Sequence, residues 1–214
     1  MKLWNLDVPL GSMYAQLQSI YTPPEEIHCE TCNRSKNSEL VVEWEDGSDL
    51  IGDFIACGAR IVAKKKIVDD ITKNFKGVFK RKIHYFDHPQ LYKKKSKKIR
   101  KRIWLPYEGP ELCEIDVVKE VDLHESSTVV IDEICSKCGG IIYGGINGVE
   151  INDSSHSIPR ISGKGLFVDA DELDGYDIFK IKYTWIILCT DNFKTFVESN
   201  CYTNVQFLEY GEII

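Results

Sequence analysis

Residues 59–85 read ARIVAKKKIVDDITKNFKGVFKRKIHY, and this stretch decides the fold class. The apolar run at 59–63 has the length of a strand. Apolar positions between 67 and 75 then recur at the spacing of one helix face, and Gly77 is a typical helix stop. The stretch at 78–85 reads as a second strand. The segment therefore predicts a strand-helix-strand unit.

The same order returns near the end of the chain. We expect a strand at 184–189 and a final strand at 204–210. Between them we expect a helix that presents Phe193, Phe196 and Val197. Each unit follows a CxxC pair, and repeats at this scale indicate architecture. A true duplication and a chance recurrence both remain open.

The expected fold class is α+β, because strands outnumber helices. We expect two similar strand-rich halves, each with a CxxC turn and a strand-helix-strand unit, joined by a shared zinc site. The first half, 1–110, contains the first CxxC and the basic segment 93–102, and the second half, 111–214, contains the second CxxC. We expect the two halves to form one compact unit.

The two CxxC pairs predict a metal site. Two residues between paired cysteines let one tight turn aim both sulfurs at a single ion, and two such turns complete a tetrahedron of thiolates. Gly139, which follows the second pair, tolerates the left-handed backbone that such turns require, and Asn33 occupies the matching position after the first pair. The expected ligands of one structural Zn²⁺ per chain are Cys29, Cys32, Cys135 and Cys138.

Two alternatives for these cysteines stay open, a redox-active CxxC and thiols without a metal, because the pairs are far apart in sequence. His28 could replace one ligand. The remaining cysteines fall in or near apolar strands and are expected to be small core residues. They are Cys57, Cys113, Cys189 and Cys201.

Composition places the chain among ordinary globular proteins, with 214 residues of which 43% are hydrophobic. Asp7 and Pro9 interrupt the N-terminal stretch where a secretory signal needs an apolar core. No apolar run approaches the roughly 18 residues of a membrane span. We therefore expect a cytoplasmic protein with no membrane partner and with reduced cysteines.

Charge is distributed unevenly. The net charge is −6, but residues 73–102 carry +12 and the rest of the chain −18. The lysine-rich segment 93–102, between Tyr92 and Trp104, could contact nucleic acid or face solvent or a partner protein. An acidic stretch could face a cationic protein or merely solvent, and its residues are Asp169, Asp171, Glu172, Asp174 and Asp177.

No enzyme signature is present. The sequence contains no GxSxG, P-loop or HExxH motif. His84 and His88 have the spacing of two ligands on a helix, but their segment reads as a strand. Gly163-Lys164-Gly165 reads as a turn. We expect no catalytic residues.

Beyond the two CxxC turns, the motifs Gly-Asp-Phe at 52–54, Asp-Ile-Phe at 177–179, Trp-Ile-Ile at 185–187 and Thr-Asn-Val-Gln-Phe at 203–207 form a recognisable set, together with Phe193. From about residue 25 to its end, the chain resembles the bacterial double-CXXCG motif family. The named members of that family are immunity proteins of the Sit toxin-immunity systems. Asn33 in place of glycine and the segment 93–102 depart from the family pattern.

This resemblance implies an antitoxin that binds and neutralises a cognate bacterial polymorphic toxin in the cytoplasm. Zinc would hold the shape of the binding protein, and the toxin-binding residues are unknown. The alternative function is a zinc-containing nucleic-acid-binding module that uses residues 93–102.

Overall fold

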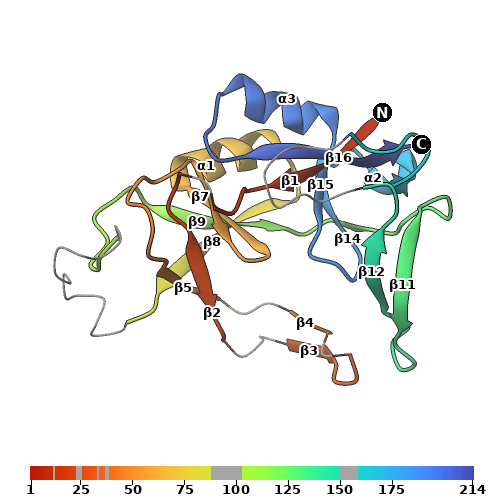
Figure 1. Ribbon diagram of the computed structural model, residues 1–214, viewed down its shortest axis with the longest axis horizontal. Helices are drawn as coiled ribbons and strands as arrows, with labels where there is room; N and C mark the ends of the chain where they lie inside the picture. The colour runs from red at the N-terminus through yellow and green to blue at the C-terminus, as the bar shows by residue number, and fades with distance from the viewer. Residues whose placement is uncertain (12, 23–25, 33, 37–38, 88–102, 150–158) are drawn as a thin grey trace.

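The computed structural model of the chain describes residues 1–11, 13–22, 26–32, 34–36, 39–87, 103–149 and 159–214 (Figure 1). It is strand-rich with few helices, as the α+β prediction requires. None of the helices in these ranges combines the length and the apolar character needed to cross a membrane.

The first large sheet, sheet I, has six strands and comes mainly from the first half of the chain. β5 runs parallel to β8, and the other neighbours are antiparallel. In the order of pairing, the strands are β2 (Leu17–Ile20), β5 (Leu40–Trp44), β8 (Val78–Tyr85), β9 (Leu112–Val117), β7 (Arg60–Lys64) and β6 (Phe54–Cys57).

The second large sheet, sheet II, also has six strands. β13 runs parallel to β16 and β10 parallel to β14, while the other neighbours are antiparallel. Its strands in order are β10 (Glu120–Val121), β14 (Ile178–Ile181), β15 (Ile187–Cys189), β1 (Lys2–Asp7), β16 (Gln206–Ile213) and β13 (Leu166–Val168).

Five neighbouring strands of each sheet follow the same plan. The order β6-β7-β9-β8-β5 in sheet I matches β14-β15-β1-β16-β13 in sheet II, with the same relative directions at every pair. In both sheets a helix connects the second strand to the fourth. The sixth strand differs, because β2 extends one sheet beyond β5 and β10 extends the other beyond β14.

The two sheets exchange strands relative to the predicted halves. β1 lies between β15 and β16 in sheet II, although it opens the chain, and β9 lies in sheet I, although it follows residue 110. A division of the chain at residue 110 therefore removes one strand from each sheet.

The two longer helices pack against each other, α1 (Lys65–Asn74) against strands of sheet I and α3 (Asp191–Ser199) against strands of sheet II. α1 buries Ile67, Val68 and Ile71, the face that the sequence pattern predicted. α3 buries Phe193 and Val197. Phe75, just after α1, contacts Phe193 with ring centroids 4.9 Å apart. Figure 1 shows the two helices side by side. This shared apolar core draws on both sheets. The third helix, α2 (Ala170–Leu173), is one turn long.

Two ribbons project from the sheets. β3 (Glu26–Cys29) pairs with β4 (Arg34–Lys36), and β11 (Val129–Ile134) pairs with β12 (Ile141–Ile146). Of the two β3 side chains that the structure describes, Ile27 is 57% exposed and Cys29 is buried.

Candidate metal centre

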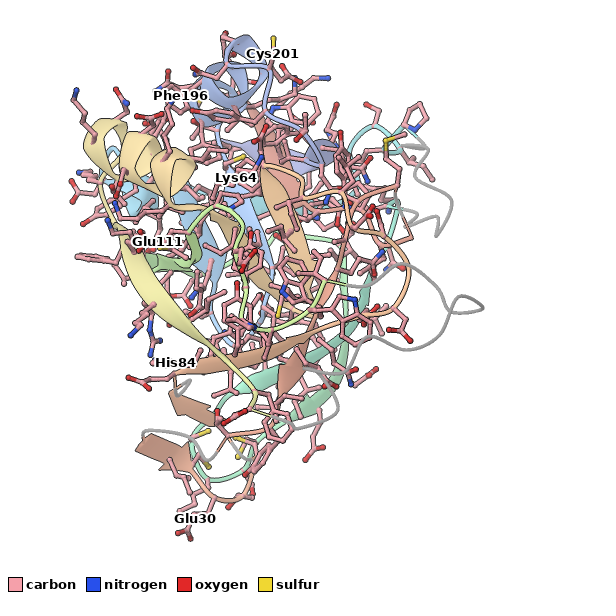
Figure 2. The ribbon with its side chains drawn as sticks, turned by 90° about the vertical axis from the view of Figure 1, so that its left-hand side faces the viewer. Glu30, Lys64, His84, Glu111, Phe196 and Cys201 are labelled. Atoms are coloured by element: carbon pink, nitrogen blue, oxygen red, sulfur yellow. The ribbon has the colours of Figure 1, made fainter. Side chains whose placement is uncertain are left out.

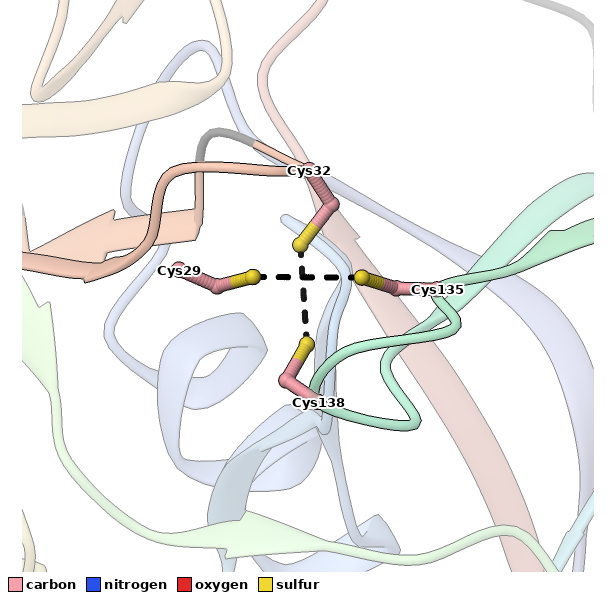
Figure 3. Close-up of side chains that lie close together, drawn as sticks. All are labelled: Cys29, Cys32, Cys135 and Cys138. Carbon is pink, nitrogen blue, oxygen red and sulfur yellow. Dashed lines mark hydrogen bonds between the residues drawn. The ribbon is translucent and has the colours of Figure 1, made fainter.

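The four predicted cysteines meet at one point between the two ribbons. The Cys29 and Cys135 sulfurs are 3.8 Å apart, those of Cys32 and Cys138 are 3.6 Å apart, and all four ligand atoms lie within 4.8 Å of one another (Figure 3). Zinc–sulfur bonds of about 2.3 Å give a tetrahedron with edges of about 3.8 Å. The four sulfurs therefore have the spacing of ligands to one metal ion.

The ribbon ends position these sulfurs. Cys29 ends β3, and Cys135 follows β11 directly. The Cys135 N–H donates to Gly140 O at 2.8 Å, and the Gly139 N–H donates back to Cys135 O at 2.9 Å. Gly139 has φ +70°, the left-handed conformation that the sequence predicted for the residue after the pair. Asn33 lies outside the described residues.

The surroundings favour the thiolate form. Backbone N–H groups, first that of Cys32 and then that of Thr31, point at the Cys29 sulfur and, against the effect of burial, lower the pKa of that thiol to about 6. The Cys138 and Lys137 N–H groups lower the pKa of Cys135 in the same way. Metal ligation requires thiolates, so these turns prepare the sulfurs for an ion.

Burial differs between the two members of each pair. Cys29 is 4% exposed and Cys135 3%, whereas Cys32 is half-buried and Cys138 exposed. Glu30, the residue after Cys29, lies at the opposite end of the molecule from Phe196 of α3 (Figure 2). Such a position suits a metal that fastens the first ribbon to the second.

Among the other candidate ligands, the structure describes the side chain of His84, which is not part of the cluster. His84 lies on β8, where its Nε2 is 3.3 Å from Glu39 Oε2. His88 and the segment 93–102 lie outside the described residues, and so does the side chain of His28. Gly163-Lys164-Gly165 forms the predicted turn before β13.

Three of the remaining cysteines are core residues as predicted. Cys57, Cys113 and Cys189 are buried, and burial raises the pKa of each thiol. The prediction for Cys201 was wrong, since this residue is exposed. It lies in the turn after α3 with φ +53°, so its position before an apolar strand did not bury it.

Two of the motifs quoted for the family resemblance, those at 52–54 and 203–207, contact each other. Asp53, before β6, accepts hydrogen bonds from the Thr203 N–H and hydroxyl through Oδ2, and Asn204 donates to Phe54 O at 2.9 Å. A side chain at position 52 would come within 2.9 Å of the Asn204 Cβ, so glycine is required there. Sequence reasoning recognised both motifs but not that they contact each other.

The acidic stretch separates into two parts. Asp169, Asp171, Glu172 and Asp174 are exposed on and around α2. Asp177 instead accepts hydrogen bonds from Thr190 and Asn192. Its backbone O also accepts from the N–H of the residue before α3, as Asp53 O accepts from the residue before α1. Asp53 and Asp177 thus occupy equivalent structural positions.

No protein-family model matches this chain, and no curated protein sequence matches it.

Proposed function

We propose that the four cysteines bind one structural Zn²⁺ per chain. The carrying observation is the sulfur spacing of 3.6 and 3.8 Å, which fits four thiolates around one ion. Four protein ligands fill a tetrahedral shell and leave no position for substrate, which is typical of structural zinc. The ion contributes no chemistry and fastens the β3–β4 ribbon, through Cys29 at the end of β3, to the β11–β12 ribbon.

We propose further that the zinc joins two similar halves, each a CxxC ribbon followed by a sheet. The equal order and directions of five strands in each sheet support this proposal. So do the equivalent positions of Asp53 and Asp177 before matching strands. In this arrangement β1 is the third of the five matching strands in the second half, the place that β9 takes in the first half.

We propose that the protein is a cytoplasmic immunity protein that binds and neutralises a cognate bacterial toxin. The support is the motif set, in which Asp53, Thr203 and the two CxxC turns all serve structure, so that the surface is left for recognition. We assign no reaction to this protein, and a fold stabilised by a metal ion suits a protein that blocks its partner by binding it.

Co-expression with a toxin whose gene is found next to the gene of this protein tests this proposal. Growth rescue together with a stable complex of the two purified proteins is the expected result. A toxin that kills equally with and without this protein contradicts it. Salt-dependent binding of the purified protein to generic DNA or RNA, lost when 93–102 is neutralised, would instead favour the nucleic-acid-binding alternative.

A further inference from the structure

The outer edge of β11 is open. β11 pairs with β12 on one side, and no other described strand joins this ribbon. Figure 1 shows β11 as the outermost strand on its side of the molecule. An open edge presents unpaired N–H and C=O groups that can pair with a strand from another chain.

Edge strands are commonly blunted by lysine, by proline or by β-bulges. The sequence of β11 contains neither lysine nor proline, but its pairing with β12 shifts register on both sides of Ile131. β11 also exposes Val130, Ile131 and Ile134, the last of them 58% exposed. Apolar side chains of this size on an open strand are typical of an interaction site.

Acidic side chains give β11 a negative charge. Asp132 and Glu133 are exposed, and neither forms an ion pair with a described residue. The Asp132 carboxylate lies where a side chain at Gly144 would stand, so the glycine in β12 makes room for it. The carboxylate is thereby held on the ribbon.

Aromatic residues lie beside the ribbon. Tyr183, in the turn between β14 and β15, comes within 3.3 Å of the position that a side chain at Gly140 would occupy, and it has φ +66°. Trp185, in the same turn, is 59% exposed. Exposed aromatic residues are frequent anchors of protein interfaces.

The negative charge of β11 favours one of two possible binding partners. A second copy of the chain, paired antiparallel through β11 in the register centred between Asp132 and Glu133, would place these acids against the same acids, and directly opposed like charges destabilise a strand pair. A strand with alternating cationic and apolar side chains would satisfy both the acids and the exposed isoleucines. Strand addition draws affinity from the main chain and specificity from such alternating side chains.

We propose that the β11 edge, residues 129–134, is a docking site for a cationic protein strand that adds to the β11–β12 ribbon. This inference rests on the proposed function as a toxin-binding protein and names the surface and the chemistry of the partner. The metal centre at the end of the ribbon holds the strand in place for pairing.

The test uses a synthetic peptide of alternating lysine and valine, with a glutamate-valine peptide as its control. We expect saturable binding of the lysine-valine peptide and no binding of the glutamate-valine peptide. Asp132→Lys with Glu133→Lys should weaken binding of the lysine-valine peptide by about 10-fold or more. The matched pair Asp171→Lys with Glu172→Lys on α2 changes net charge equally and should leave binding within about 2-fold. Methylation of the peptide's pairing N–H groups should abolish binding.

Equal losses in the two charge-reversed variants, or full binding by the methylated peptide, would overturn the proposal. So would a dimer in light scattering that the Asp132/Glu133 variant dissociates, because the occupant would then be a second copy. Zinc content and thermal unfolding check that each variant is folded.

Toxin rescue separates this inference from the proposed function. If the wild-type protein rescues growth and the Asp132/Glu133 variant rescues equally well, the docking site is wrong and the immunity function stands. If the wild-type protein gives no rescue, the immunity function fails, and the peptide experiment still decides whether the edge binds cationic strands.

Discussion

Asp53 and Thr203, 150 residues apart in sequence, are joined by reciprocal hydrogen bonds. The Asp53 N–H donates to the Thr203 hydroxyl at 2.9 Å, and that hydroxyl donates to Asp53 Oδ2 at 3.0 Å. The Thr203 N–H donates to the same carboxylate oxygen at 2.9 Å. This contact ties the start of β6 in sheet I to the segment that enters β16 in sheet II.

Asp53→Ala should therefore lower the free energy of unfolding by about 2 kcal/mol, because hydrogen bonds to a charged group are lost. Chemical denaturation measures this difference. Asp171→Ala, which removes an exposed carboxylate from α2, serves as the control and should change stability little. Equal unfolding free energies for the wild type and Asp53→Ala would show that the contact does not contribute.

The same contact predicts a dependence on pH. Burial raises the pKa of Asp53, but the Thr203 hydrogen bonds and Lys64 outweigh it, so the pKa in the folded protein lies below the ordinary value. The carboxylate thus stabilises the fold above the unfolded-state pKa of about 3.9, and the contribution disappears as the pH falls through the lower, folded-state pKa. The stability difference between the wild type and Asp53→Ala should shrink from about pH 5 to about pH 3. A difference that is constant over this range would contradict the prediction.

The metal centre predicts that purified protein contains one zinc per chain. Cys135→Ser should lose the metal and unfold at a lower denaturant concentration, because it removes a buried ligand. Cys201→Ser is the matched control, since Cys201 lies outside the cluster, and it should keep both metal and stability. Elemental analysis measures the content. Iron in place of zinc would be visible by its colour, and no metal in freshly reduced protein would disprove the centre.

Leu3→Ala should cost about 3 kcal/mol, because Leu3 is 0% exposed at the centre of sheet II and its truncation leaves a cavity. Leu10→Ala, at a position 68% exposed, should have almost no effect. Denaturant unfolding compares the two variants. A small cost at Leu3 would mean that β1 contributes little to the sheet.

Local patterns predicted much of the fold. The stretch 78–85 is β8, and the periodic apolar residues between 67 and 75 include the buried face of α1. The clustering of the four cysteines was predictable, because the geometry of zinc ligation fixes the two-residue spacing within each CxxC pair.

Long-range pairing was not predictable in the same way. β1 was not recognised as a central strand, since nothing within residues 2–7 specifies that their neighbours are β15 and β16. The open edge of β11 could be recognised only once β12 was known as its pairing partner among the described strands. The exposure of Cys201, in contrast to the buried Cys57, Cys113 and Cys189, likewise follows only from the three-dimensional structure. Partner choice between distant segments depends on tertiary packing, which local periodicity does not record.

The place of β1 has a consequence for synthesis of the protein. During translation residues 2–7 leave the ribosome long before residues 206–213 of β16, which is one of their two pairing partners. Sheet II therefore cannot close until β16 has emerged, whereas all the strands of sheet I are complete once residue 117 has emerged. We expect sheet I to form during translation and sheet II to form slowly afterwards, as strand pairings distant in sequence do.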